Sequence, residues 1–462
     1  MSTTIIGKVR LRILNKVRHT ELSFIEKKGH AYIHMKITQD CNTIIQSVPV
    51  LISALDDLIS VIVIYLYIAF ISIETFIVNI AFISCSILYF YSKYFSIKKE
   101  MKKSGIKEIE FFSILYGVLH GFKQIKINSK KNNDLFKDVD IVSKESEQLK
   151  VQGLVTHRNH VMRIMIINFA MFATILFALP IYFENVRFSI LKIFGALLFA
   201  QGPYEMVFRS FATIAMTNVA VDNLMQLENE LDKTHKLSFD PADNFYDFKK
   251  LSLRDISFQY KDSQGETTFN FGPIDLSINK GDVLFIVGGN GSGKSTLLKL
   301  LTGLYQPLYA GKIYVDNELI DLHTYPAYRQ LFSVIFTDYY LFRKLYGLES
   351  VEENKVREML KTMLLHRKTK FINNQFTNTN LSTGQRKRLA CIESLLEDKP
   401  INIFDEWTAD QDPDFRKYLY DAILPDLRKQ GKTVIIVTHD DRYFDRADKV
   451  ITMEEGKIKH IS

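Results

Sequence analysis

The chain has 462 residues, a length that favours two or three domains, and 47% of its residues are hydrophobic. Long apolar runs fill the first half, whereas the second half has the composition of a soluble α/β domain. The formal net charge is +7, and much of the excess lies beside the apolar runs, which favours membrane lipid as a partner and not nucleic acid. The three cysteines show no paired spacing, which argues against a disulfide framework or a zinc site.

Residues 1–45 are basic and helix-like, and no secretory signal with a cleavage site is visible. Four candidate membrane spans follow, at Val48 to Ile71, Thr75 to Tyr94, Val161 to Phe183 and Phe188 to Phe211. The first two have the roughly 20 apolar residues that a bilayer requires. The fourth contains polar residues or proline at Lys192, Gln201, Pro203, Glu205 and Arg209. We therefore expect the fourth span to face protein or a water-filled path more than lipid.

Lysines set the predicted orientation in the membrane. They follow the second span directly, at Lys93, Lys98, Lys99, Lys102 and Lys103. The two short connections within the span pairs carry one basic residue, Arg187. Because basic residues stay on the cytoplasmic side, the N-terminus, residues 96–160 and the C-terminal domain are all predicted to be cytoplasmic.

Two features of the apolar half leave alternatives open. Asp56 and Asp57 interrupt the first span, and such acids either belong to a substrate or proton path or sit near a helix end or pair with a neighbouring basic residue. Residues 96–160 have a helical period with alternating Lys and Glu, so they would extend the flanking helices. A bend near Gly117 to Gly121 would then dock on the C-terminal domain, or the segment is a solvated helical hairpin.

The soluble domain begins near Phe248, after a polar linker that includes Asp240 to Asn244. Leu253 to Tyr260 alternates as a strand, and Phe271 to Ile278 is the expected partner of an antiparallel hairpin. Tyr260 is placed to stack on an adenine ahead of a nucleotide site, although an isolated aromatic residue is more often a packing residue.

A phosphate-binding loop of the type G-x-x-x-x-G-K-S organises this domain. Its residues are Gly288, Gly289, Asn290, Gly291, Ser292, Gly293, Lys294 and Ser295, with Thr296 opening a helix. The run Asp282 to Val287 reads as a buried strand, so the glycines fall where a strand turns into a helix and backbone N–H groups can face a polyphosphate. Lys294 would contact the β- and γ-phosphates of ATP, and Ser295 would hold Mg²⁺.

Three further segments carry chemistry, although each is weak by itself. Leu381, Ser382, Thr383, Gly384 and Gln385 precede a predicted helix at Arg386 to Leu396, whose N-terminus can meet an anion. Ile401 to Asp405 is a buried strand that ends in a Mg²⁺-binding acid, and Glu406 follows as a base for the attacking water. Val434 to His439 is another buried strand, which ends in a histidine able to reach a γ-phosphate.

The order and spacing of these motifs are specific, and residues 250–462 resemble the nucleotide-binding domain of an ABC transporter. The resemblance implies a P-loop α/β domain with an antiparallel β subdomain, in which Gly288 to Ser295 is the Walker A motif and Leu381 to Gln385 the signature, acting on the partner's nucleotide. It makes Glu406 and His439 catalytic, and Tyr260 the adenine-stacking residue. Mg²⁺ would be held by Ser295, Asp405 and, where the family usually has glutamine, Thr337.

The segments Leu381 to Ala390, Phe404 to Pro413 and Thr438 to Phe444 resemble the cyclic-peptide and siderophore exporter branch, which includes pyoverdine, syringomycin and lasso-microcin exporters. The resemblance implies a homodimer in the bacterial inner membrane that exports a cyclic peptide, lipopeptide or siderophore-like peptide. Asp410 would contact the other nucleotide domain.

That branch has six spans in each chain, and four are visible here. Residues 1–45 resemble the extension after the second span, so the first hairpin is the expected missing part, through a mis-called start, a split gene or a degenerate transporter. The alternative to export is therefore a membrane-anchored ATPase or a half-transporter without complete transport activity.

Overall fold

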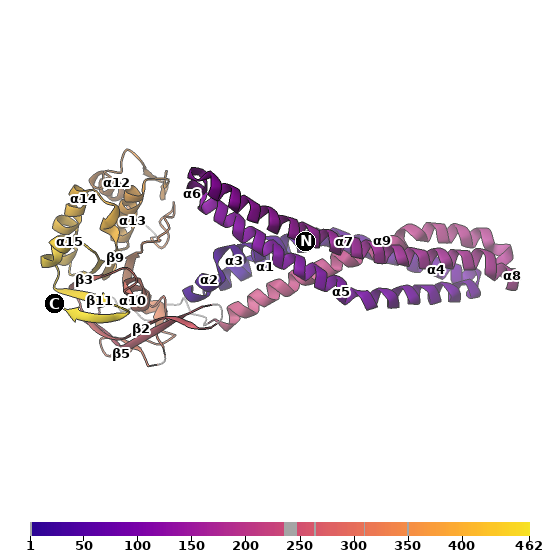
Figure 1. Ribbon diagram of the computed structural model, residues 1–462, viewed down its shortest axis with the longest axis horizontal. Helices are drawn as coiled ribbons and strands as arrows, with labels where there is room; N and C mark the ends of the chain where they lie inside the picture. Colours follow the sequence, from indigo (N-terminus) through magenta and orange to yellow (C-terminus); the bar gives the residue numbers. More distant parts are fainter. Residues whose placement is uncertain (1, 235–246, 263–264, 309, 349–350) are drawn as a thin grey trace. The chain divides into compact units, whose positions relative to one another are not determined.

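The computed structural model describes residues 2–234, 247–262, 265–308, 310–348 and 351–462. The chain forms two compact units, which are Met1–Thr20 with Phe24–His235, and Glu21–Ser23 with Lys236–Ser462 (Figure 1). The predicted linker at Asp240 to Asn244 lies outside the described residues.

The first unit is helical. Its helices are α1 (Ser2–Val17), α2 (Leu22–Lys28, shared at its start with the second unit), α3 (His30–Met35), α4 (Cys41–Ile71), α5 (Ile73–His120), α6 (Phe122–Ile127), α7 (Ser129–Ala173), α8 (Leu179–Tyr182) and α9 (Glu184–Lys233). Short π-helical segments at Lys36–Asp40 and Thr174–Ala178 join α3 to α4 and α7 to α8. As predicted, α5 and α7 continue through residues 96–160, and the chain bends at Gly121.

Three helical segments among the described residues are long and apolar enough to cross a membrane, His30–Ile71, Ile73–His120 and Ser129–Tyr182. They contain the first three predicted spans. The fourth predicted span lies within α9, which packs extensively on α4 but does not reach the same apolar composition. Glu205 and Arg209 of α9 form an ion pair one turn apart, which lowers the cost of placing charge there. The fourth span stays a prediction.

Polar groups inside the helical unit are partly paired across helices. The Tyr204 hydroxyl donates to Ser86 Oγ at 2.9 Å, and the Tyr89 hydroxyl lies 2.8 Å from His160 Nδ1. Apolar residues of α4, α5, α7 and α9 surround these bonds in one core. By contrast, Asp56 and Asp57 lie in the middle of α4, and neither forms an ion pair with any described residue of this chain. The structure of one chain therefore does not support the helix-end or ion-pair interpretation, and a substrate or proton path stays a prediction.

The second unit contains two main sheets. The four-stranded antiparallel sheet has the order β2 (Thr267–Asn279), β1 (Lys250–Lys261), β4 (Lys312–Val315) and β5 (Glu318–Leu319). The six-stranded sheet has the order β12 (Lys457–Ile461), β11 (Lys449–Glu454), β3 (Val283–Gly288), β10 (Thr433–Val437), β9 (Ile401–Asp405) and β6 (Phe332–Ile335). The predicted hairpin is confirmed as β1 and β2, with Tyr260 opposite Phe269.

Helices connect and cover these strands. They are α10 (Lys294–Leu301), α11 (Tyr325–Arg329), α12 (Glu353–Thr362), α13 (Thr383–Glu397), α14 (Pro413–Tyr418) and α15 (Leu424–Lys429), and a small hairpin pairs β7 (Phe371–Ile372) with β8 (Gln375–Phe376). Strands β3, β10 and β9 run parallel, and every residue of β9 and β10 is buried. Burial on both faces explains their continuous apolar sequence.

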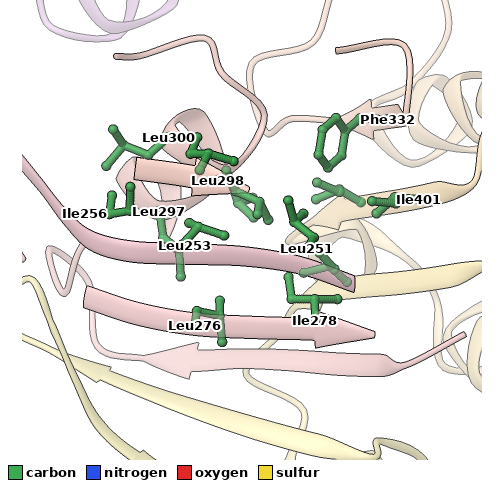
Figure 2. Packing of buried hydrophobic residues seen from close by; sticks show 14 of the residues in the cluster. Leu251, Leu253, Ile256, Leu276, Ile278, Leu297, Leu298, Leu300, Phe332 and Ile401 are labelled. Carbon is green, nitrogen blue, oxygen red and sulfur yellow. The ribbon is translucent and has the colours of Figure 1, made fainter. Parts of the chain in front are cut away.

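One apolar core holds the helix that follows the phosphate loop. Leu297, Leu298 and Leu300 of α10 are fully buried among residues of both sheets. Figure 2 shows these leucines beside Leu251 and Leu253 of β1. Burying a leucine side chain stabilises a fold by about 1.5–3 kcal/mol, so α10 is firmly anchored beneath the loop.

Two glutamates of α13 are partly buried one turn apart. The Ser333 hydroxyl contacts the Glu397 carboxylate and lies 2.8 Å from Ser394 Oγ. Burial, and then the charge of Glu397, raise the pKa of Glu393 to about 7. In the folded chain Glu393 therefore holds its proton to a higher pH than in the unfolded chain.

We expect Glu393→Gln to stabilise the second unit at pH 8 and to have little effect at pH 5. Between the ordinary value of 4.5 and the folded pKa of about 7, the folded state binds more protons. The free energy of unfolding therefore falls as pH rises through this window and stays low above it. The gain at pH 8 should be about 1 kcal/mol, because residual contact with water weakens the penalty.

The measurement is denaturant unfolding followed by fluorescence of Trp407, the only tryptophan and a fully buried one in this unit. Glu358→Gln, at an exposed position of α12, is the control. A Glu393→Gln chain with the same pH dependence as the parent would contradict the assignment.

Candidate functional site

The phosphate loop joins β3 to α10, and Gly288, Gly291 and Gly293 all have a positive φ that favours glycine. A Cβ on Gly288 would lie 2.4 Å from the carbonyl oxygen of Met453, so no larger residue fits. Gly293 has a φ of 99°, a left-handed conformation that glycine adopts without strain, and it precedes the first turn of α10. The loop is thus held against β11 and turns directly into a helix N-terminus.

Two polar side chains of the loop, those of Lys294 and Ser292, are buried. Lys294 is 6% exposed, and its Nζ donates to the carbonyl oxygens of Gly288 at 3.0 Å and Gly289 at 3.1 Å. The Ser292 hydroxyl is buried without a hydrogen-bond partner among the described residues. Buried polar groups normally have partners, so this arrangement fits an anionic ligand in the loop.

Two adjoining cavities contain all the residues predicted to bind ATP. One, of about 450 Å³, is lined by Tyr260, Thr268, Phe269, Asn290, Gly291, Ser292, Gly293, Lys294, Ser295, Thr296 and Glu406. The other, of about 610 Å³, shares Asn290 to Ser292 and reaches Gly288 and Gly289. The sequence-based prediction missed Thr268 and Phe269. The predicted hairpin could have indicated them, because Phe269 lies opposite Tyr260 in the strand pair.

Tyr260 both packs in the core and faces the smaller cavity. Its ring contacts those of Phe258, Phe269 and Tyr305, and its hydroxyl lies 3.2 Å from Thr296 Oγ1. The two interpretations of this residue are therefore compatible, since one ring edge can pack while the other lines the site. Adenine stacking stays a prediction.

The catalytic candidates meet where parallel strands end. Asp405 is the last residue of β9, and it lies opposite Val437 of β10. The Glu406 backbone N–H donates to Val437 O at 3.1 Å. Two residues beyond Val437, His439 places its Nε2 atom 3.4 Å from Glu406 Oε1, and Lys294 Nζ lies 3.9 Å from the same oxygen. The structure thus brings a carboxylate, an imidazole and an ammonium group together.

Asp405 is buried, and the residue at the usual glutamine position influences its charge. It is 2% exposed, and burial, with the nearby charge of Glu406, raises the pKa of Asp405 to about 6. The N–H and hydroxyl groups of Thr337 favour the charged carboxylate and so lower that pKa in part. Thr337 therefore lies close enough to Asp405 to affect its charge, and its role as a Mg²⁺ ligand stays a prediction.

The residues predicted to hold Mg²⁺ fit a hard cation that also binds phosphate oxygens. Asp405 offers a carboxylate, and Ser295 and Thr337 offer hydroxyl oxygens, with Ser295 lining the smaller cavity. Mg²⁺ commonly uses one or two protein ligands together with substrate phosphates. Among the described residues no group of three or more His, Cys, Asp or Glu side chains forms a metal cage.

The signature segment opens α13, which begins at Thr383, three residues before the predicted start at Arg386. The reason is a capping box between Ser382 and Gln385, which satisfies backbone groups of the first turn. Neither cavity described above is lined by Leu381 to Gln385. Ser382 and Thr383 are exposed, and the segment lies outside the cavities at this chain's own phosphate loop.

Asp410 forms an ion pair within its own chain. Its Oδ2 atom lies 2.6 Å from Lys387 Nζ of α13. The predicted contact of Asp410 with a second nucleotide domain stays a prediction, and the intrachain ion pair is an additional role that the sequence did not indicate.

Comparison with known proteins gives this site its class. Residues 271–409 match the family model for the ABC transporter. The energy-coupling factor transporter ATP-binding protein EcfA1 of Mycoplasma genitalium is 35% identical over 195 residues, which are 40% of this chain and 70% of that protein. The second unit is therefore an ABC transporter ATPase domain that binds ATP, and the chain belongs to the ABC transporter family.

Similarity also extends through the helical unit. The ATP-binding protein SyrD of Pseudomonas syringae pv. syringae is 29% identical over 476 aligned positions, which cover 99% of this chain and 83% of that protein. A solved bacterial Atm1-family ABC exporter with ATP bound shares the fold, with a TM-score of 0.80 and 15% identity, over 100% of this chain and 82% of that one. The predicted fold class, a helical exporter-type domain followed by a P-loop ATPase domain, is confirmed.

Lys294→Ala should weaken ATP binding at least about tenfold, because a buried ammonium that binds phosphate is lost while the backbone loop remains. The dissociation constant of a fluorescent ATP analogue measures this. Lys280→Ala, at a largely exposed surface pair with Asp247, is the control and should bind as the parent does. Parent-like affinity in the Lys294→Ala chain would refute the role.

Mg²⁺ affinity in the presence of ATP should fall below about pH 6, the pKa of Asp405, by roughly tenfold for each pH unit, because a protonated carboxyl cannot ligate the ion. Thr337→Val removes a hydroxyl group that lowers the pKa of Asp405, so the fall should begin at a higher pH. Mg²⁺ titration followed by Trp407 fluorescence measures both effects. Thr362→Val, whose hydroxyl bonds within α12, is the control. A pH-independent affinity would exclude Asp405 as the ligand.

Proposed function

We propose that this chain is one half of a homodimeric ABC exporter, which couples ATP hydrolysis to export of a cyclic peptide, lipopeptide or siderophore-like peptide across the bacterial inner membrane. Its ATPase domain would lie in the cytoplasm. The observation that carries the hydrolytic part is the convergence on one oxygen, Glu406 Oε1, of His439 Nε2 at 3.4 Å and Lys294 Nζ at 3.9 Å.

Each group has a distinct task in this proposal. Glu406 would accept the proton of the attacking water, and Lys294 would stabilise negative charge on the phosphates. His439, with a side chain 53% exposed, would reach the γ-phosphate from the edge of the sheet. Ser295, Asp405 and Thr337 would hold Mg²⁺, whose charge would polarise the phosphate oxygens.

The placement of the signature segment supports the homodimer. Leu381 to Gln385 lie outside both cavities at the phosphate loop, whereas the segment is exposed at a helix N-terminus. A second copy can offer that N-terminus to the bound nucleotide, and the exchange then completes two equivalent sites. ATP binding would close the pair, and hydrolysis would reopen it.

The peptide class of the cargo rests on sequence resemblance. The three segments that resemble the cyclic-peptide and siderophore exporters contain the signature, Glu406 and His439. In addition, the similarity to SyrD covers 99% of this chain. The apolar, aromatic-rich helices α4, α5 and α7 are compatible with such a cargo.

Glu406→Gln should lower kcat for ATP hydrolysis at least about 100-fold and leave the dissociation constant for ATP within about twofold, because the base is lost while the phosphate cradle remains. Membrane vesicles that carry the chain provide the assay, and a cyclic peptide should raise the activity of the parent but not of the variant.

A linear peptide of the same composition is the control for the cargo. Parent activity in Glu406→Gln would remove the catalytic assignment. Glutamate-dependent hydrolysis that no cyclic peptide changes would instead favour a membrane-anchored ATPase without this cargo.

A further inference from the structure

The first turns of α13 present one face to the loop that follows β9. Gly384, Lys387 and Arg388 are three and four residues apart, so they share that face of the helix. A Cβ on Gly384 would lie 2.7 Å from the Asp410 carbonyl oxygen, so glycine allows the loop to touch the helix backbone. Gln411 Nε2 donates to Gly384 O at 3.0 Å, and Arg388 Nε donates to Gln411 Oε1 at 2.9 Å.

Lys387 lies at the centre of this contact and is only 4% exposed. Its Nζ donates to the backbone carbonyl oxygen of Glu406 at 2.8 Å and pairs with Asp410 Oδ2 at 2.6 Å. Its own carbonyl oxygen accepts the indole N–H of Trp407 at 2.7 Å. One residue of α13 is therefore bonded to three positions of the loop between Glu406 and Asp410.

The backbone of Glu406 depends on such support. Its φ is 48°, a left-handed conformation that a residue with a side chain adopts only where its surroundings hold it. The N–H of Glu406 donates to Val437 O at 3.1 Å. Its carbonyl oxygen accepts from Lys387 Nζ at 2.8 Å and from the Ala409 N–H at 3.3 Å. These bonds orient the peptide groups on either side of Cα, and hence the direction of the carboxylate, and the bond from the lysine ammonium is the shorter of the two to the carbonyl.

A lysine suits this position because one ammonium group serves a carbonyl and a carboxylate together. A buried charge needs hydrogen bonds and a counter-ion, and Glu406 O and Asp410 supply both. An apolar side chain would fill the space but would leave the Glu406 carbonyl oxygen without this donor.

We propose that Lys387 is a positioning residue for ATP hydrolysis. It holds Glu406 in the backbone conformation that directs its carboxylate towards Lys294 and His439. Through Asp410 and Gly384 it also joins this loop to the signature segment, so that the segment and the catalytic carboxylate of one chain move together. The inference rests on the proposed role of Glu406.

Lys387→Met should lower kcat at least about tenfold while the dissociation constant for ATP stays within about twofold, because the phosphate loop is untouched. Lys387→Gln retains a donor for the carbonyl and should lose less. Asp410→Asn leaves the bond from lysine to carbonyl in place and should lower kcat only about two- to fivefold.

The chain contains a matched control far from the phosphate loop in sequence and outside both cavities. Lys432 Nζ donates to the backbone carbonyl oxygen of Asp398 at 2.9 Å and pairs with Asp398 Oδ1 at 2.7 Å. Asp398 also has a left-handed φ, of 51°. Lys432→Met therefore removes the same kind of bridge, and it should leave kcat within about twofold of the parent.

A residue that acts through Glu406 should add nothing once that carboxylate is gone. In single-turnover hydrolysis, the double variant Lys387→Met with Glu406→Gln should match Glu406→Gln alone. A further loss in the double variant, an equal loss in Lys432→Met, or a Lys387→Met chain with the parent kcat would each overturn the inference.

Folding and the role of Glu406 are tested separately. If Lys387→Met loses the Trp407 unfolding transition, Lys387→Gln and Asp410→Asn decide, and parent kcat in both would overturn the inference. Parent activity in Glu406→Gln would overturn the proposed catalytic base, whereas an inactive Glu406→Gln beside a fully active Lys387→Met would overturn only the role of Lys387.

Discussion

The chemistry of the ATPase domain depends on the parallel pairing of three buried strands. In the register of β3, β10 and β9, Ile286 and Asp405 both lie opposite Val437. Because parallel strands end at the same edge of a sheet, the segments that follow them must meet there. The phosphate loop, the Asp405–Glu406 pair and His439 are separated widely in the sequence, and this register alone brings them within a few ångströms.

The core beneath that edge explains why the groups are held there. The leucines of α10 are buried among residues of both sheets. This packing holds the phosphate loop at the edge where the strands end. Asp405 is buried, and charges interact more strongly at a buried site than in water. The same burial raises the pKa of Asp405, and the neighbouring Thr337 opposes that shift in part.

The apolar helices of the helical unit carry polar residues, and these side chains need hydrogen-bond partners inside the bundle. Tyr204 with Ser86 at 2.9 Å, and Tyr89 with His160 at 2.8 Å, pair across helices. A polar group inside an apolar bundle is costly unless it has such a partner, and the pair then fixes the register of the two helices. Helix α5 continues without a break to the bend at Gly121, and α7 begins at Ser129 after the short helix α6, so both are long elements.

The sequence by itself determined the elements whose signals are local. The phosphate loop between a strand and a helix, the hairpin of β1 and β2, and the strand that ends in Asp405 were all predictable, because spacing and apolar pattern over a few residues specify them. Only the tertiary structure decided which distant residues meet. It placed Phe269 opposite Tyr260, brought Thr337 near enough to Asp405 to affect its charge, and buried Lys387 against Glu406 and Asp410. The physical reason is that burial, an ion pair or a shared hydrogen bond depends on packing between segments far apart in the chain, and no local pattern of side chains encodes that packing.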